Sequence, residues 1–262
     1  MAKKILTIVL TVIVFISVAV LGVSSICRVS EITIKSEFVS PAAQAEEQEM
    51  LERLEDAYDK ESMFLVNRGK CEEIVADYPH FRITKFKKSF PNRIVVYLAE
   101  DPEVYAIPTI ENDEKYYILG GDGTVLGIRD SKENRLDGED NVFIRGLTLS
   151  GEKGGQLSGD ARYENVYAVC SALSESLGDI RQNVLSVYVY DEQPEICIRM
   201  REGINIYLGN IADRPQEKAK LAIDRYLEME SSKRLTGYIA VSTNREGTLI
   251  LADGTDDVFN RE

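Results

Sequence analysis

Apolar residues along this chain follow helical and strand periods, but the first segment shows neither alternation nor charge. From Ile5 to Cys27 there is no charged residue over 23 positions. A helix of that length is long enough to cross a hydrocarbon core of roughly 30 Å. The pattern therefore predicts a transmembrane helix over residues 5–27, preceded by a short cytoplasmic tail over residues 1–4.

Basic residues flank this apolar run on both sides. Lys3 and Lys4 precede it and Arg28 follows it, and lysines before a membrane helix favour a cytoplasmic N-terminus. A cleaved signal peptide is the competing interpretation, although its apolar region is about 7–15 residues long and ends in small residues. A lipoprotein anchor at Cys27 fits less well, because the bulky Ile26 precedes it. The length of the run favours an uncleaved anchor, with the rest of the chain outside the membrane.

Residues 29–101 carry a pattern of one strand, two helices and two more strands. Val29–Ser36 alternates as a strand does, and Ser40 followed by Pro41 is typical of a helix start. A second, shorter helix ends before Pro79. The apolar positions expected on the inner faces of these two helices are Met50, Leu51, Leu54, Tyr58, Ile74 and Val75.

A β-hairpin closes this first region. The segments 81–88 and 93–100 alternate on either side of a Phe-Pro-Asn turn at Phe90–Asn92. Ile94, Val96 and Leu98 share one face of the second arm. A sheet with two helices on one face is a stable two-layer arrangement, so we expect this apolar face to pack against the helices.

Residues 102–252 have a different rhythm, in which short strands are separated by glycine-rich turns. Two helices are expected here, one from Asp160 to a stop at Gly178 and one that begins near Pro215. The last strands are Tyr238–Ser242 and Thr248–Ala252. The predicted fold class is α+β, here as a mixed α+β domain with a largely antiparallel sheet and an acidic flexible tail over residues 253–262.

Charge limits the kinds of partner. The 262 residues carry a net charge of −13, and the first 28 residues hold three basic residues and no acid. The rest of the chain is therefore more acidic than the whole. Such a surface is unsuited to nucleic acid, and we expect protein partners instead.

One basic group stands out against this acidic background, on the predicted hairpin. Its members are Arg82, Lys85, Lys87, Lys88 and Arg93. They are interpreted either as outward strand positions that deter edge pairing or as a recruitment face for an acidic partner or for anionic lipid headgroups.

Residues able to carry catalysis are scarce. His80 is the only histidine and lies in a turn-like "DYPHF" stretch, with no nucleophile motif around it. A sortase-like transpeptidase would need a Cys at the end of a strand, whereas Cys197 lies inside "EICIRM". The other cysteines, Cys27, Cys71 and Cys170, are widely spaced and form neither a disulfide framework nor a zinc pattern.

The Gly-Gly-Asp-Gly stretch at 120–123 is interpreted as a hairpin turn. A phosphate loop would need a following Lys-Ser/Thr and a helix, and a calcium loop would need alternating acids. Taken together, these residues predict a protein that is not an enzyme and that has no cofactor, metal or small-molecule substrate.

The order of these features resembles the FtsQ/DivIB family of bacterial division proteins. In that family a polypeptide-transport-associated (POTRA) domain ends in a Phe-Pro-Asn turn, an alternating strand and Glu-Arg-x-Pro. The hairpin "YYILGGDGTVLG" and the stretch "GINIYLGN" before a helix are also similar to the family's second domain. The residues that fit the first pattern are Phe90, Pro91, Asn92, Ile94, Val96, Glu100 and Pro102.

Three features depart from the family pattern. The cytoplasmic tail has only about four residues, the Arg of the Glu-Arg-x-Pro motif is missing, and Ala240 stands where the family has Asp. These departures affect the details of partner docking rather than the scaffold.

The resemblance implies a POTRA-like domain over 29–101 and an FtsQ/DivIB-type β domain over 102–252. It also implies a non-enzymatic, single-pass membrane scaffold at the division septum. Such a scaffold binds FtsL and FtsB/DivIC-type proteins outside the membrane and helps to assemble septal cell-wall synthesis. The residues implied to bind partners, at the end of the β domain, are Thr243, Arg245, Thr248, Leu249, Ile250 and Leu251.

Two other function classes stay open. A membrane-anchored component of a sporulation or secretion assembly could reuse a POTRA-like domain, and it would be expected to form rings or to lack the second domain. An anchored cell-wall enzyme would depend on His80 or on an external cysteine.

Overall fold

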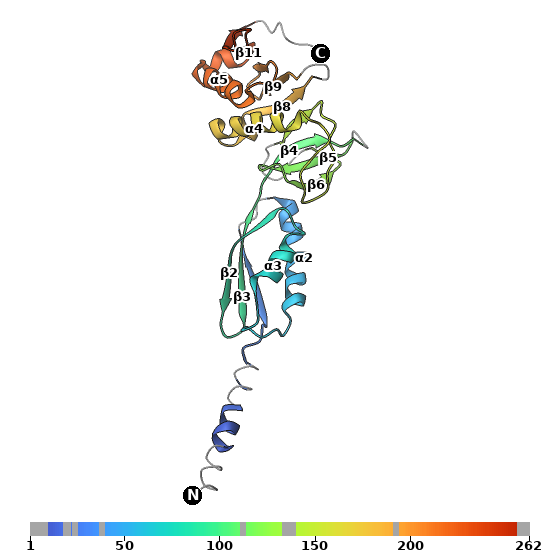
Figure 1. Cartoon of the computed structure of the whole chain (residues 1–262), viewed down its shortest axis with the longest axis vertical. Helices are drawn as coiled ribbons and strands as arrows, with labels where there is room; N and C mark the ends of the chain where they lie inside the picture. The colour runs from blue at the N-terminus through green and yellow to red at the C-terminus, as the bar shows by residue number, and fades with distance from the viewer. Residues whose placement is uncertain are drawn as a thin grey trace. The chain divides into compact units, whose positions relative to one another are not determined.

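The computed structural model describes residues 10–17, 22, 26–36, 40–110, 114–132, 140–190 and 194–255 (Figure 1). The chain divides into two compact units, Met1–Glu100 and Asp101–Glu262. This division falls one residue before the boundary predicted at Pro102. The predicted tail over 1–4 lies outside the described residues.

The predicted transmembrane helix over 5–27 is not borne out. Among the described residues of this segment, 10–17, 22 and 26 are helical. Within the described ranges, no helix combines the length and the apolar character needed to cross a membrane. Residues 5–9, 18–21 and 23–25 lie outside those ranges, and the orientation across a bilayer stays a prediction.

The first unit has the predicted order of one strand, two helices and two strands. Its three-stranded sheet has the order β1-β3-β2, in which β1 is parallel to β3 and β2 is antiparallel to it. The elements are β1 (Glu31–Lys35), α2 (Pro41–Tyr58), α3 (Arg68–Val75), β2 (Phe81–Ser89) and β3 (Arg93–Glu100).

Helices α2 and α3 cover one face of this sheet, and the core lies between the two layers. The Ser40 hydroxyl caps α2 by accepting a hydrogen bond from the Ala43 amide at 3.1 Å, as the sequence predicts. Leu51 and Ile74 are only partly buried against this core. The predicted inner positions that are fully buried in it are Met50, Leu54, Tyr58, Val75, Ile94, Val96 and Leu98.

The second unit is built around a nine-stranded sheet. Its order is β12-β11-β10-β9-β8-β7-β4-β5-β6. The elements are β4 (Glu103–Pro108), β5 (Tyr116–Gly120), β6 (Val125–Arg129), β7 (Val142–Arg145), α4 (Tyr163–Leu177), η1 (Ile180–Gln182), β8 (Val184–Val189), β9 (Ile196–Met200), β10 (Asn205–Leu208), α5 (Pro215–Glu228), η2 (Ser231–Arg234), β11 (Tyr238–Thr243) and β12 (Leu249–Gly254).

This sheet is mixed, and five of the eight neighbouring pairs among its described strands are antiparallel, in line with the largely antiparallel sheet that was predicted. The parallel pairs are β10 with β11, β7 with β8, and β4 with β7. Parallel neighbours require a crossover rather than a tight hairpin. Here α4 connects β7 to β8 and α5 connects β10 to β11, so the two predicted helices create two of the parallel pairs, whereas the chain passes from β4 to β7 through β5 and β6.

Strand β7 is the element that the sequence pattern did not reveal. It has only four residues and lies inside the sheet between β4 and β8. Val142, Phe143 and Ile144 are all buried, so the strand shows no alternation of apolar and polar positions. A short continuous apolar run of this kind carries little periodic information.

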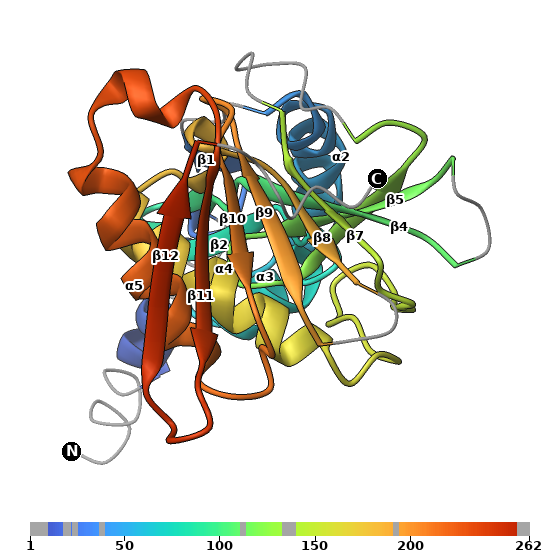
Figure 2. The same cartoon turned by 90° about the horizontal axis from the view of Figure 1, so that it is seen from above.

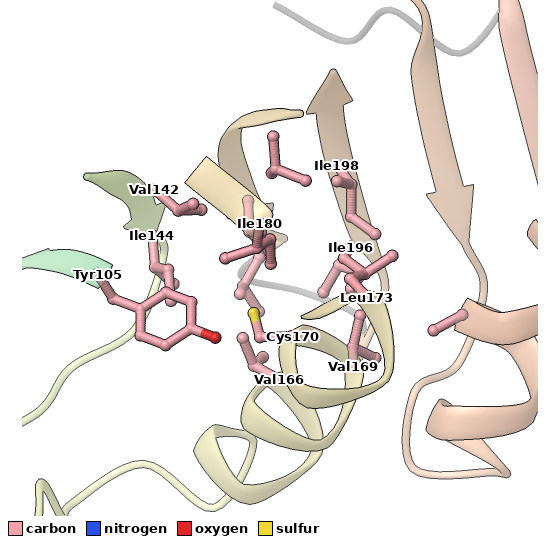
Figure 3. Close-up of a cluster of buried hydrophobic side chains, with 14 of the residues drawn as sticks. Tyr105, Val142, Ile144, Val166, Val169, Cys170, Leu173, Ile180, Ile196 and Ile198 are labelled. Atoms are coloured by element: carbon pink, nitrogen blue, oxygen red, sulfur yellow. The ribbon is translucent and has the colours of Figure 1, made fainter. Parts of the chain in front are cut away.

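The core of the second unit lies between the sheet and the helices α4 and α5. Cys170 and Leu173 of α4 face Ile196 and Ile198 of β9 and Tyr105 of β4 (Figure 3). Figure 2 looks onto strands β7–β12 with both helices behind them, so the helices cover one face of these strands, and no described helix lies on the other.

The chain end also differs from its prediction. Strand β12 continues through Gly254, whereas the flexible tail was expected to begin at residue 253. Asp253 is held in the strand because it pairs with Ile239 of β11 and binds a helix side chain. Residues 256–262 of the predicted tail lie outside the described ranges.

Leu173→Ala tests the core of the second unit. Leu173 is fully buried between α4 and the sheet, and removing its side chain leaves a cavity. We expect a loss of about 2–5 kcal/mol in unfolding free energy. Urea unfolding followed by circular dichroism measures it, and the exposed Glu175→Ala on the same helix is the control. A cost equal to that of the control contradicts this description of the core.

Candidate functional site

Strand β12 forms one edge of the nine-stranded sheet. Among the described strands its only neighbour is β11, to which it is antiparallel from Thr243 opposite Leu249 to Tyr238 opposite Gly254. The outer side of an edge strand presents N–H and C=O groups that have no strand to bond to. This edge is the candidate binding site.

The turn before β12 fixes which backbone groups point outward. The Asn244 amide donates to the Thr248 carbonyl at 2.9 Å, and the Gly247 amide donates to the Asn244 carbonyl at 3.1 Å. Gly247 has a φ of +78°, which completes a three-residue turn with a glycine bulge. Hydrogen-bonded pairs then alternate along the ladder, so the amide of Ile250 faces β11, and those of Leu249 and Leu251 face outward.

The structure places the six predicted residues on this one hairpin. Leu249 and Leu251 are half-buried on the side of α5, and Leu251 packs against the core. Ile250 points to the opposite face and is 48% exposed. The remaining three lie at or beside the turn, where Arg245 and Thr248 are exposed and Thr243 is half-buried.

Helix α5 holds the edge strand in place. Arg225 of α5 donates to one carboxylate oxygen of Asp253 from Nε at 2.9 Å and from Nη2 at 2.7 Å. This hydrogen bond and the charge of Asp253 raise the pKa of Arg225 above its ordinary value. The pair anchors the last part of β12 to the helix that packs on β11.

The buried ammonium group of Lys218 supports the turn between β11 and β12. Lys218 of α5 is fully buried, and its Nζ donates to the carbonyls of Gly209 and Asn210, both at 2.8 Å. Its Nζ also lies 3.6 Å from Asp213, which accepts a 2.6 Å hydrogen bond from the Thr243 hydroxyl. Removal from water lowers the pKa of Lys218, and the bond from Thr243 lowers the pKa of Asp213.

Sequence reasoning missed these supporting residues. Arg225 and Asp253 are 28 positions apart, and Thr243 and Asp213 are 30 positions apart. No local spacing links such pairs. Only the parallel crossover from β10 through α5 to β11 brings them together.

The opposite edge of the sheet is less open. The Val125 amide of β6 donates to the Gly155 carbonyl at 2.9 Å, and the Gly154 amide donates to the Val125 carbonyl at 2.8 Å. Thr124 also forms a bridge with Gln156. The segment around Gly154–Gln156 thus covers the start of β6, and β12 is the more accessible of the two edges.

The predicted basic group of the first unit lies on β2 and at the start of β3, and it is not a single patch. Lys85, Lys87 and Arg93 are exposed, and Arg93 pairs with Glu31 at 2.7 Å. Lys88 instead donates to the Met63 carbonyl at 3.1 Å, which ties the hairpin to the segment between the helices. Arg82 is exposed at the far end of β2.

One further cation belongs with this group and was not predicted. Lys35 of β1 lies over the ring of Tyr97, 5.9 Å from its centre, and Lys85 lies over the same ring at 5.5 Å. The parallel register of β1 on β3 places Lys35 opposite Tyr97. That register could not be inferred from residues so far apart in sequence.

The residues considered for catalysis occupy structural positions. His80 is 5% exposed, and its Nδ1 lies 3.0 Å from Glu46 on α2. Cys27, Cys71 and Cys170 are buried, and Cys197 is half-buried. Burial raises the pKa of Cys71 to about 11 and that of Cys170 to about 12, so these thiols stay protonated.

The Gly120–Gly123 stretch is confirmed as a hairpin turn between β5 and β6. The Gly120 amide donates to the Thr124 carbonyl, and Asp122 accepts from the Thr124 amide and hydroxyl, each at 2.9 Å. Gly123 has a φ of +82°, in the region that favours glycine. In the part of the chain that the structure describes, no three His, Cys, Asp or Glu side chains gather in a way that could hold a metal.

Comparison with known proteins gives one relative and no family model that matches the chain. The relative is "Cell division protein DivIB" of Clostridium tetani (strain Massachusetts / E88), which is 29% identical over 84 residues. The match covers 30% of this chain and 31% of the relative, about a third of each. It confirms the resemblance to the FtsQ/DivIB proteins inferred from the sequence.

Asp213→Asn tests the brace beneath the turn through its pH dependence. The folded pKa of Asp213 is lowered, so its contribution to stability is present above the unfolded pKa of about 4 and is lost as pH falls through the folded value. We expect the variant to be less stable than the original chain at pH 6, and the difference to shrink at pH 3. Thermal unfolding at both pH values measures it, and an unchanged difference contradicts the role of this carboxylate.

Proposed function

We propose that this protein is a cell-division scaffold that acts by binding rather than by catalysis. The similarity to a protein named for cell division supports the division role. The observation that carries the mode of action is the open edge of β12, where Leu249 and Leu251 direct their amides away from β11.

The amino-acid composition of β12 supports its use as an edge to which a partner strand can add. Edge strands that avoid pairing are commonly blunted by lysine, proline or a bulge. The first unit's edge strand β2 follows this rule, with Lys85, Lys87 and Lys88 and an irregularity between Ile83 and Lys85. Strand β12 reads LILADG and contains neither lysine nor proline, and its one charged residue, Asp253, is engaged by Arg225.

A partner strand can add to such an edge. Backbone hydrogen bonds to β12 would supply affinity, and the alternate side chains would supply specificity. Ile250, which is exposed on the face opposite the helices, offers an apolar contact, and Arg245 and Thr248 offer polar contacts at the turn. The proposed partners are FtsL and FtsB/DivIC-type proteins at the division septum.

The basic hairpin of the first unit is proposed as a secondary recruitment face. Lys85, Lys87 and Lys35 lie on its sheet surface away from the helices, in an acidic protein. An acidic partner would meet complementary charge here. Lys88 is a less suitable contact, because it already bonds the Met63 carbonyl.

Leu249→Pro tests strand addition most sharply. Proline removes an outward amide, and such a change is tolerated on the solvent side of an edge strand, while the inward amide of Ile250 is kept. We expect binding of a DivIC-type protein to weaken by up to about tenfold, the loss of one backbone hydrogen bond. Titration by isothermal calorimetry measures the change.

Leu249→Thr is the matched control, since it alters the side chain and keeps the amide. The melting temperature of both variants shows whether the hairpin still folds. Equal affinity for the original chain and the folded Leu249→Pro variant would sink strand addition at this edge. A fluorescent fusion that fails to concentrate at midcell would refute the division role itself.

A further inference from the structure

The open face of the second unit's sheet contains a hollow that the β12 edge does not use. Its volume is about 370 Å³, and it lies over β7–β10. Figure 2 looks onto this face, away from α4 and α5. Aromatic, basic and amide side chains dominate its lining, which includes Phe143, Tyr188, Tyr207, Arg145, Arg199 and Asn141.

Strand register sets these side chains in two adjacent rows. One row runs from Phe143 through Ser186 and Arg199 to Asn205, and it follows the pairing of β7, β8, β9 and β10. The short Ser186 lies between the larger Phe143 and Arg199, and both Ser186 and Asn205 line the hollow.

The second row runs from Arg145 through Tyr188 and Cys197 to Tyr207. Arg145 and Arg199 lie two strands apart, which corresponds to roughly 10 Å across the sheet. That separation suits two carboxylates of one extended ligand.

Two of the basic side chains of this hollow are stacked on an aromatic ring rather than paired with an acid among the described residues. Lys132 and Arg145 both lie over the ring of Phe143, each 4.5 Å from its centre. Neither of them, nor Arg199, forms an ion pair within the described part of the chain. Asp140 is the single carboxylate in the lining. In a protein of net charge −13, this local excess of positive charge is complementary to an anion.

Asn141 supplies an independent indication of a ligand. It is 2% exposed, lines the hollow, and has no hydrogen-bond partner at either Oδ1 or Nδ2 in the described structure. A buried amide without partners costs stability. Its donor and acceptor together match the carbonyl and N–H of a peptide group.

The hollow continues into two neighbours, which favours an extended ligand over a compact one. One neighbour shares Phe143, Arg145 and Tyr188 with it, and the other shares Tyr190 and Tyr207. Together they cross from the end of β4 to β11, six adjacent strands. At about 4.8 Å per strand this is roughly 24 Å, the length of about seven extended residues.

We propose that this face binds an extended acidic segment of a partner protein across β4 to β11. Arg145, Arg199 and Lys132 take its carboxylates, Tyr188 and Tyr207 pack against its apolar side chains, and Asn141 bonds a backbone amide. Tyrosine and arginine are the residues that dominate such interfaces. The site is on the face of the sheet and β12 is its edge, so either proposal can fail without the other.

Charge reversal tests the site. The probe is a fluorescein-labelled heptapeptide that alternates glutamate with leucine, and a glutamine–leucine heptapeptide is its neutral counterpart. We expect the full chain to bind the acidic peptide. The double variant Arg145→Glu with Arg199→Glu should bind it about tenfold or more weakly. Lys220→Glu with Lys233→Glu, two exposed positions on α5 and η2, changes the net charge equally and should leave the affinity unchanged.

The outcomes separate clearly in fluorescence polarisation. No binding of the acidic peptide, equal binding of the neutral one, or equal losses in both double variants overturns the proposal. Preference for a carboxylated polysaccharide such as hyaluronan over the peptide also overturns it, because the occupant would then be a glycan.

Asn141→Leu gives a second readout that a structural role would not produce. Replacing an unpartnered buried amide with an apolar side chain of similar size should raise the melting temperature. The same change should lower the affinity for the acidic peptide. A lower melting temperature, or unchanged affinity, shows that Asn141 is not a ligand-binding group and contradicts its place in the site.

Discussion

The backbone of β12 faces a constraint that every open sheet must meet. A strand at the edge has one neighbour, and half of its amides and carbonyls need water, a cover or another chain. In this protein the edge strand β12 has helix α5 on one side and solvent on the other side, the open face of the sheet. Arg225 binds Asp253, and Lys218 and Asp213 hold the turn. These contacts keep the strand ordered and in register while its outer side remains available.

The same sheet has two unlike faces. Helices α4 and α5 bury the apolar residues of alternate positions, among them Ile196, Ile198 and Ile206. The intervening positions, such as Arg199, Cys197 and Tyr207, lie on the face away from α4 and α5 and line the hollow (Figure 2). Because side chains alternate along each strand, the core and the hollow are two consequences of one register. A partner could therefore engage the edge and the face separately.

Much of the fold could be predicted from local pattern. The N-cap at Ser40, the turn at Gly120–Gly123 and the apolar stripe of α2 depend on near neighbours in sequence, and the structure has them. Long-range pairing could not be predicted in this way. Strand β7 lacks alternation, and its parallel pairing with β8 depends on a helical crossover.

The first segment shows the limit of composition. An uncharged run of sufficient length predicted a spanning helix, whereas no helix of the described residues is long and apolar enough to cross a membrane. The length and apolar character of a segment show that it is able to form a membrane-spanning helix, but they do not determine how far the helix extends.

The candidate site was located by resemblance rather than by residue chemistry. Nothing in Thr243, Arg245 or Leu249 marks an edge, because edge status depends on the order of all nine strands. Asn141 and Arg199 gave no signal either, since neither belongs to a motif and only the folded sheet brings them to one hollow. The role of a single polar residue in a strand can be inferred only when the face of the sheet on which it lies is known.

Amide hydrogen exchange of β12 tests the central claim most directly. The amides of Leu249, Leu251 and Asp253 should exchange rapidly in the isolated protein, because the ladder with β11 leaves them facing outward. On addition of a DivIC-type partner they should become protected, while the inward amides of Ile250 and Ala252 change little. Rapid exchange of the outward amides in a demonstrated complex would contradict strand addition at this edge.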